Sequence, residues 1–123
     1  MIGPSAAFLA GMMAWVASVT GLPVPPTPKI IFDTVWTEDA DAYALPGEIH
    51  LKRNWDQNRT QDQAYLAHEL VHIAQWAAHV KYHCQNEAER LAYAVQAIYL
   101  SKFAVDFWED HPPRWLAGKE ECR

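Results

Sequence analysis

The segment His68-Glu69-Leu70-Val71-His72 combines two imidazoles and a carboxylate at a spacing suited to a helical zinc site. Two histidines four positions apart on a helix are about 6 Å apart along its axis and point to the same side, so both can bind one Zn²⁺. Glu69 should lie beside the metal, where it can take a proton from a zinc-bound water that attacks a carbonyl. The pattern predicts a metallopeptidase-type centre with His68 and His72 as ligands and Glu69 as general base.

The motif needs a third protein ligand, because a catalytic zinc keeps one of its coordination positions open for water. The metzincin continuation would place a glycine and a histidine at positions 75 and 78, whereas the chain has Gln75 and Ala78 there. His79 and His83 follow the same helical stripe, but a continuous helix would carry His79 about 16 Å from His68. We therefore expect His79 and His83 to be surface histidines.

Two glutamates of the next predicted helix, Glu87 and Glu89, are candidates for the third ligand. Glu89 shares a helix face with Tyr93 and Gln96, which gives it the polar surroundings of a site. Glu89 could instead return a capping hydrogen bond to the backbone near Asn86. We prefer Glu89 as the ligand and keep Glu87 as the alternative. Tyr93 could donate a hydrogen bond to an oxyanion or simply be a buried tyrosine.

A capping pattern predicts the helix that carries the motif. Thr60 with Gln63 forms a capping box and Asp62 adds negative charge to the first turn, so the helix should run from Thr60 to about His79. Apolar residues at intervals of three and four define its buried face. They are Leu66, Leu70, Ile73, Ala74 and Ala77.

A second capping pattern, Asn86 with Glu89, predicts another long helix through about Trp108. It should end at His111-Pro112-Pro113, because proline disfavours helical torsions in the residue before it. The expected core residues of this helix are Leu91, Val95, Ile98 and Phe103.

The N-terminal third predicts a helix followed by an extended connector. Residues Ser5 to Leu22 are mainly apolar, with a bulky helical stripe, and Thr20-Gly21 should end the helix. The stripe consists of Phe8, Met12, Trp15 and Val19. Residues 22–28 hold four prolines, which suits an extended segment that crosses the surface.

The segment before the motif helix predicts a small sheet. Lys29 to Asp33 is a short β-prone run, and Glu38 to Ala44 could form one helical turn. Pro46-Gly47 is a turn signal, and Glu48 to Trp55 alternates as a half-buried strand does, with Ile49 and Leu51 facing inward. His50 on this strand could line a substrate groove, but a lone strand histidine is more often solvated, so we expect it to be solvated.

Composition favours one domain that spans residues 1–123, since half of the chain is hydrophobic, which is enough for a modest core. The net charge is -5 and no basic cluster is interleaved with aromatics, so we expect no nucleic-acid partner. The apolar N-terminal stretch is marginal for a membrane span and follows no Lys or Arg, unlike a signal peptide. The expected class is α+β, mainly helical.

The two cysteines, Cys84 and Cys122, could form one bridge that fastens the C-terminal tail to the start of a helix. Such a bridge would point to an oxidising compartment and hence to export, whereas the missing charged n-region argues against an ordinary secretory signal. The location and the oligomeric state stay open at this point.

The motif followed by Glu89-Arg90-Leu91-Ala92-Tyr93 resembles the gluzincin arrangement of zinc metallopeptidases, in which an HExxH helix precedes a helix with a glutamate ligand. It looks closest to small uncharacterised bacterial domains that join an HELVH-type helix to a cysteine and then to an ExxAYxxQ helix. This chain matches them at Cys84, Glu89, Ala92, Tyr93 and Gln96. Residues 15–25 also resemble these domains.

This resemblance implies a zincin-like fold, with the motif helix between an N-terminal helix, the glutamate-bearing helix and a small sheet. It also implies Zn²⁺ held by His68, His72 and Glu89, and a peptide or protein substrate. Thermolysin-like enzymes carry an aspartate four residues after the ligand glutamate, where this chain has Tyr93.

Three functions follow as hypotheses. In the first, the domain is a zinc-dependent peptidase whose substrate adds along the strand from Ile49 to Arg53. In the second, it binds zinc without turnover and acts as a regulatory or partner-recognition domain. The third is a metal-free interaction module that uses its tryptophans, and it has the least support.

Overall fold

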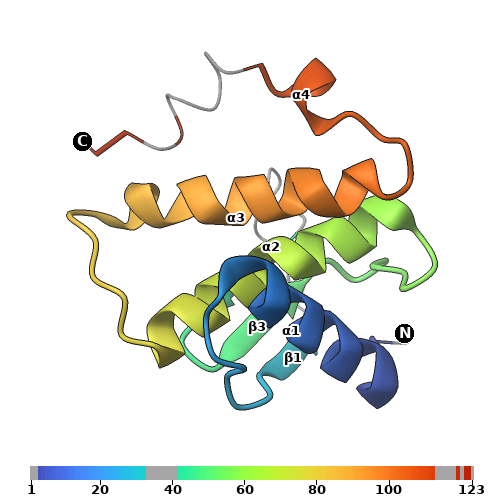
Figure 1. The fold of residues 1–123 in the computed structure, drawn as a ribbon. Coiled ribbons are helices and arrows are strands. Elements are labelled where there is room, and N and C mark those ends of the chain that lie inside the picture. The colour runs from blue at the N-terminus through green and yellow to red at the C-terminus, as the bar shows by residue number, and fades with distance from the viewer. Residues whose placement is uncertain (1–2, 33–41, 113–118, 120, 123) are drawn as a thin grey trace.

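The computed structural model describes residues 3–32, 42–112, 119, 121 and 122, and in this part the fold is α+β. The elements are α1 (Ala6–Thr20), β1 (Lys29–Phe32), β2 (Ala42–Leu45), β3 (Glu48–Leu51), α2 (Thr60–Ala77), α3 (Gln85–Ser101) and α4 (Phe107–Asp110). The motif helix α2 lies between α3 on one side and α1 with the sheet on the other (Figure 1). The predicted class, mainly helical α+β with these neighbours around the motif helix, is confirmed.

The sheet has the order β1-β3-β2, so β3 is its central strand. β1 runs parallel to β3, with Ile30 opposite Ile49, and β2 runs antiparallel to it, with Ala44 opposite Ile49. The predicted turn at Pro46-Gly47 joins β2 to β3. Gly47 has a φ of 79°, a left-handed conformation that glycine adopts without a clash of Cβ.

Three expectations for this region are wrong. Residues 42–44 belong to β2 rather than to a helical turn, because pairing with β3 overrides the helix propensity of alanine; residues 38–41 lie outside the described part. The predicted strand from Glu48 to Trp55 ends at Leu51. His50 is buried, because the Tyr43 ring stacks on it at a centroid distance of 4.4 Å and its Nε2 lies 3.1 Å from Glu48 Oε2. Ile49 and Leu51 face inward as predicted.

Helix α1 has the predicted extent but buries a shifted face. The Ser5 hydroxyl accepts a hydrogen bond from the Phe8 amide, and Gly21, at a φ of 77°, ends the helix. Of the predicted stripe, Met12 is buried, Phe8 and Trp15 are partly buried, and Val19 is exposed. The buried set, at helical spacing of three and four, is Leu9, Met12, Met13 and Val16.

Helix α2 begins at Thr60 as predicted, but the capping box does not form. Arg59 is the residue before the helix, and its side chain makes no capping hydrogen bond. The helix ends at Ala77, two residues before the predicted end, and His79 has a φ of 56°. Four of the five predicted core residues are buried, whereas Ala77, in the last turn, is exposed to solvent.

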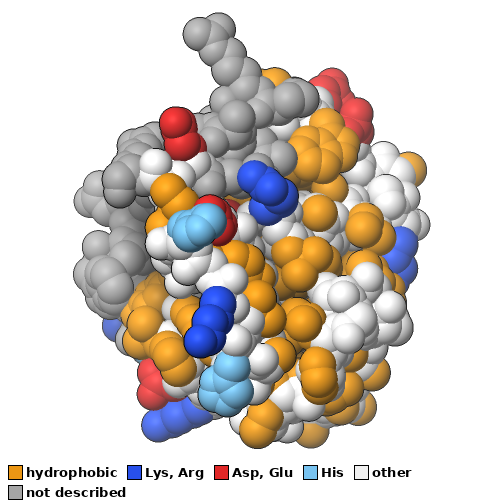
Figure 2. Space-filling model, turned by 60° about the vertical axis from the view of Figure 1, so that its left-hand side comes forward, with side chains coloured by type: hydrophobic (Ala, Val, Ile, Leu, Met, Phe, Trp, Pro, Cys, Tyr) orange, Lys and Arg blue, Asp and Glu red, His pale blue; other side chains and the backbone are white. Residues whose placement is uncertain are grey.

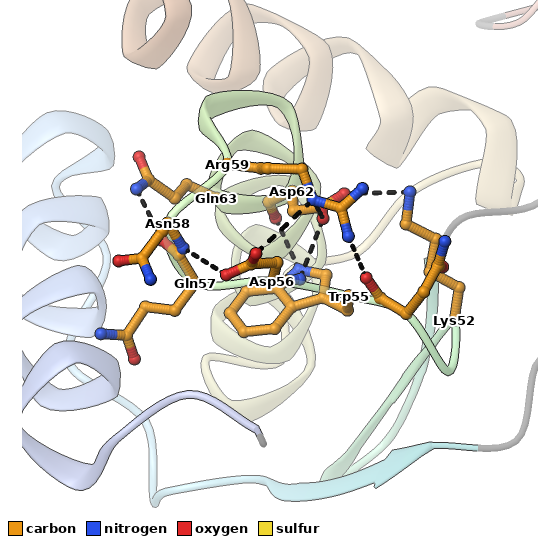
Figure 3. Close-up of polar contacts among 9 residues, drawn as sticks. Lys52, Trp55, Asp56, Gln57, Asn58, Arg59, Asp62 and Gln63 are labelled. Carbon is orange, nitrogen blue, oxygen red and sulfur yellow. Dashed lines mark hydrogen bonds and ion pairs between the residues drawn. The ribbon is translucent and has the colours of Figure 1, made fainter. Parts of the chain in front are cut away.

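A buried carboxylate fastens the start of α2 to the loop before it (Figure 3). Asp62 accepts a hydrogen bond from the Asp56 amide at 2.9 Å, and its oxygens lie 3.0 Å from Lys52 Nζ and 3.2 Å from Arg59 Nε. The indole of Trp55 donates to the Asp62 carbonyl at 2.7 Å. Asp62, which was expected to interact favourably with the helix dipole, therefore also holds the residues between β3 and α2 in place.

Helix α3 is displaced and shorter than predicted. It begins at Gln85 after Cys84 and ends at Ser101, because the chain then turns through Ala104 at a φ of 59°. The separate helix α4 follows, with the Asp106 side chain accepting from the Trp108 amide. Val95 is buried and Leu91 half-buried, as expected, whereas Ile98 and Phe103 are 46% and 47% exposed.

One hydrophobic cluster joins α1, β3, α2 and α3. Side chains from all four elements, such as Val16, Leu51, Leu70 and Val95, are almost fully buried in it. This cluster holds α2 in place along most of its length. Among the described residues, no helix has the length and apolar character needed to cross a membrane.

Candidate metal centre

Helix α2 places the three motif side chains on one buried face. His68, Glu69 and His72 are only 4% to 8% exposed, and one ligand atom from each lies within 4.8 Å of the others. The Glu69 carboxylate is 4.0 Å from His68 Nε2. The spacing of the motif thus produces the clustering that it predicts.

Helix α3 adds the carboxylate of Glu89 to this group. Glu89 Oε1 lies 2.5 Å from His72 Nε2, and its Oε2 lies 3.3 Å from His68 Nε2. Glu87, the alternative ligand, instead contacts the exposed His83, with a distance of 2.9 Å between Glu87 Oε1 and His83 Nδ1. The structure brings together the four predicted site residues, His68, Glu69, His72 and Glu89, and leaves Glu87 outside.

Two glutamines contact the other nitrogen of each motif histidine. His68 Nδ1 lies 2.8 Å from Gln96 Oε1, and His72 Nδ1 lies 2.9 Å from Gln75 Oε1. An amide oxygen accepts hydrogen bonds and cannot donate them, so each Nδ1 carries the proton. Both Nε2 atoms are then directed at Glu89, which is where a cation would be bound.

The charges of the site perturb its titrating groups. Burial raises the pKa of Glu69, although the neighbouring histidines oppose this shift. Burial would lower the pKa of His72, but the hydrogen bond to Glu89 and the charge of Glu69 outweigh it and raise that pKa. Burial would raise the pKa of Glu89, but hydrogen bonds with both histidines hold it well below its usual value. Glu89 is therefore an anion in the pair that it forms with the histidines.

The donor set fits a zinc ion. Two imidazole nitrogens and one carboxylate are a common ligand set for catalytic zinc, and ligands at tetrahedral positions are about 3.3 Å from one another. The distance of 3.3 Å between Glu89 Oε2 and His68 Nε2 agrees with this spacing. The shorter contact joins His72 Nε2 directly to Glu89 Oε1, and a cation between the two groups would replace it.

A cleft of about 420 Å³ opens above these side chains. Its aromatic lining includes Tyr43 of β2, Tyr65 and Trp76 of α2, and Tyr93 of α3. The Tyr93 ring packs edge-on against His68 at a centroid distance of 4.6 Å. The cleft therefore gives a ligand access to the histidines between the sheet and α3.

Several residues of the site were not predicted from the sequence. Gln75 was noted only as a departure from the metzincin pattern, although its position three residues after His72 places it on the same helix face. Tyr43 and His111 line the cleft from segments far from the motif in sequence. His111 was expected only to mark a helix end, and it stacks on Phe107 at 4.1 Å. No local spacing links Tyr43 or His111 to the motif.

The remaining predicted histidines lie away from the centre. His79 and His83 are exposed, as expected, in the connection between α2 and α3. Figure 2 turns this end of the molecule forward and shows histidine, Lys and Arg side chains dispersed among hydrophobic and uncharged ones. The histidines of this connection thus belong to the surface rather than to the candidate metal centre.

Residues 41–111, more than half of the chain, match the family described as Domain of unknown function (DUF6647), and the chain belongs to this family. The matched segment contains all four residues of the centre and both glutamines that contact it. No curated protein and no solved structure matches the chain.

Proposed function

We propose that this member of the DUF6647 family is a zinc-dependent metallopeptidase that hydrolyses peptide bonds. In this proposal His68, His72 and Glu89 hold the cation, and Glu69 is the general base. The observation that carries it is the convergence of three donor groups from two helices beside a buried carboxylate, at the floor of a cleft. The gluzincin resemblance of the sequence agrees with this arrangement.

Bound zinc would supply Lewis acidity, which acidifies a water molecule and polarises the scissile carbonyl. Glu69 accepts the proton of the attacking water and delivers it to the leaving amine, as the new C–O bond forms and the C–N bond breaks. The raised pKa of Glu69 suits this role, because a base that must release its proton again works best with a pKa near the working pH.

The substrate contacts the sheet through β2 in this proposal. The strand from Ile49 to Arg53 was expected to pair with the peptide, but that expectation is wrong, because β3 is paired on both edges. Among the described residues β2 is an edge strand, and its residues Ala42, Tyr43 and Ala44 line the cleft. An extended peptide that adds to β2 would lie along the cleft that His68, Glu69 and His72 also line.

Metal content and peptide cleavage test the proposal. Protein purified without chelators is expected to contain about one zinc per chain and to cut members of a diverse peptide library, as detected by mass spectrometry. Glu69→Gln should keep the zinc but lose about 10²- to 10⁴-fold in kcat. Glu89→Gln should lose zinc, whereas the matched variant Glu87→Gln on the same helix should retain both zinc and activity. A wild-type protein that binds no divalent cation would refute the proposal.

A second candidate function keeps the zinc and omits turnover. The cleft of about 420 Å³ is modest, and the described part of β2 offers only four residues for pairing. These observations favour a domain that recognises a partner or regulates it through the metal site. Full zinc occupancy without cleavage of any library member would select this function over the first.

The disulfide bears on the location of the protein. Cys84 and Cys122, whose pairing the sequence left as a possibility, are bridged, with their Cα atoms 5.7 Å apart. Since disulfides persist in oxidising compartments, we propose that the protein works outside the reducing cytosol. Mass measurement of protein isolated from its native cells, before and after reduction, tests this location.

A further inference from the structure

The two glutamines at the metal centre join α2 to α3 as well as contacting the histidines. Gln96 of α3 reaches across to His68 of α2. Gln75 accepts from His72 on its own helix and donates through Nε2 to the Ala88 carbonyl at 3.1 Å. Ala88 directly precedes Glu89, so the same amide fixes one histidine ligand and the backbone beside the carboxylate ligand.

The contacts of Gln75 determine which way its amide points. The Ala88 carbonyl can only accept, so the amide nitrogen faces Ala88 and the amide oxygen faces His72. His72 must therefore donate from Nδ1 and present Nε2 to the cation. Both glutamines are almost fully buried, at 3% and 5% exposure, so water does not compete for these bonds.

We propose that Gln75 and Gln96 are positioning residues that hold His68 and His72 with protonated Nδ1 and with Nε2 directed at a bound divalent cation. This inference rests on the proposed metal site but not on peptide hydrolysis. Zinc-bound histidines commonly donate to a carboxylate, a backbone carbonyl or water. Here both partners are neutral side-chain amides, which orient the rings without making them as basic as a carboxylate does.

This assignment predicts opposite effects for two kinds of substitution. Gln96→Leu and Gln75→Leu keep most of the volume but remove the acceptor, and each should weaken zinc binding about 10- to 100-fold. Gln96→Glu keeps the acceptor and adds a negative charge, which makes His68 more basic and should tighten zinc binding relative to the wild type. A residue with only a packing role would not produce a gain with one variant and a loss with the other.

The chain offers a matched control in Gln63. This glutamine of α2 also contacts α3, since its Oε1 accepts a hydrogen bond from the Tyr99 hydroxyl at 2.7 Å. Within the described part of the chain, its side chain forms no hydrogen bond with a histidine. Gln63→Leu should lower the free energy of unfolding through the loss of the bond with Tyr99 and of the bond that its Nε2 donates to the Gln57 carbonyl. It should leave zinc affinity within about twofold of the wild type.

The experiment uses the full chain with zinc or cobalt alone as probes. Zinc affinity is measured by competition with a chromophoric chelator, and the visible absorption of Co²⁺ reports the geometry of its ligands. We expect weaker zinc and an altered Co²⁺ spectrum for both leucine variants, tighter zinc for Gln96→Glu, and wild-type values for Gln63→Leu. If a leucine variant does not fold, the zinc affinity of Gln96→Glu alone tests the positioning role.

Three results separate the possible failures. Leucine variants that bind zinc as the wild type does, with unchanged Co²⁺ spectra, would overturn the positioning role. An equal loss of zinc affinity in Gln63→Leu, or no gain of zinc affinity in Gln96→Glu, would show that the glutamines act only through packing. Either result would also overturn the positioning role. A wild-type protein that binds neither cation would instead remove the metal site itself, and with it the proposed function.

Discussion

Replacement of Asp62 by asparagine tests how the loop before α2 is held in place. The residue is 1% exposed, and three donors surround its carboxylate: the Asp56 amide, Lys52 Nζ and Arg59 Nε. Asparagine preserves the shape and one acceptor oxygen, so it removes the charge with little change in packing. The substitution therefore isolates the electrostatic part of the network shown in Figure 3.

The expected loss follows from the exposure of the partners. Breaking a fully buried ion pair costs about 3 to 5 kcal/mol when the remaining charge stays buried. The side chains of Lys52 and Arg59 are 23% and 51% exposed, so both cations can turn toward water. We therefore expect the free energy of unfolding to fall by about 2 to 3 kcal/mol, the value of charged hydrogen bonds. For a domain of this size, that lowers Tm by about 8 to 12 °C.

Urea unfolding monitored by tryptophan fluorescence and circular dichroism measures this loss, with Asp56→Asn as the matched control. The Asp56 side chain is 46% exposed and lies 3.8 Å from Arg59 Nε. As a surface ion pair it should contribute about 1 kcal/mol or less. Equal losses for the two variants, or a loss below about 1 kcal/mol for Asp62→Asn, would contradict the view that burial of the carboxylate sets its contribution.

Three further outcomes are expected. Zinc at a free concentration of about 100 times its Kd should stabilise the fold by about 2.7 kcal/mol, detected as a Tm that falls on chelation, and His72→Ala should abolish this shift. Replacing both Cys84 and Cys122 by serine should lower the free energy of unfolding by about 4 kcal/mol, because the bridge joins residues 38 positions apart; urea midpoints that reduction leaves unchanged would contradict this. Hydrogen bonds from the backbone and the side chain of His83 hold the pKa of Glu87 below its usual value in the folded protein. The Glu87 carboxylate therefore stabilises the fold at pH values above the pKa that it has in the unfolded chain. This contribution is lost as the pH falls through the lower pKa of the folded protein. The difference in urea midpoint between wild type and Glu87→Gln should therefore shrink between about pH 6 and about pH 3.

Local spacing was sufficient for the parts of the site that lie on one helix. His68, Glu69 and His72 converge because four residues make about one helical turn, whatever packs around α2. The extent of α1 was equally local, since Ser5 and Gly21 mark its two ends. These features could be predicted because each depends on residues within a turn or two of one another.

Features that depend on how elements dock were missed. The strand β2 forms because β3 pairs with it, and Tyr43 then covers His50, which no pattern within either strand indicates. Ile98 and Phe103 were expected in the core because the helix was assumed to continue, but α3 ends at Ser101 and the chain turns away. The spacing of hydrophobic residues shows which of them could be buried on one helix face. It does not show where the helix ends or how far the elements packed against it extend.

The choice between Glu87 and Glu89 depended on the same kind of information. The buried side of α3 is defined by Ala88, Ala92 and Val95, which are 0% to 3% exposed against the core. Glu89 precedes Ala92 by three positions, so it lies next to the buried face of α3, on the side that faces α2. Glu87 lies in the first turn of α3 and contacts His83 in the preceding loop. Packing of small alanines therefore sets the rotation of α3, and that rotation makes one of two nearby glutamates the partner of the histidines.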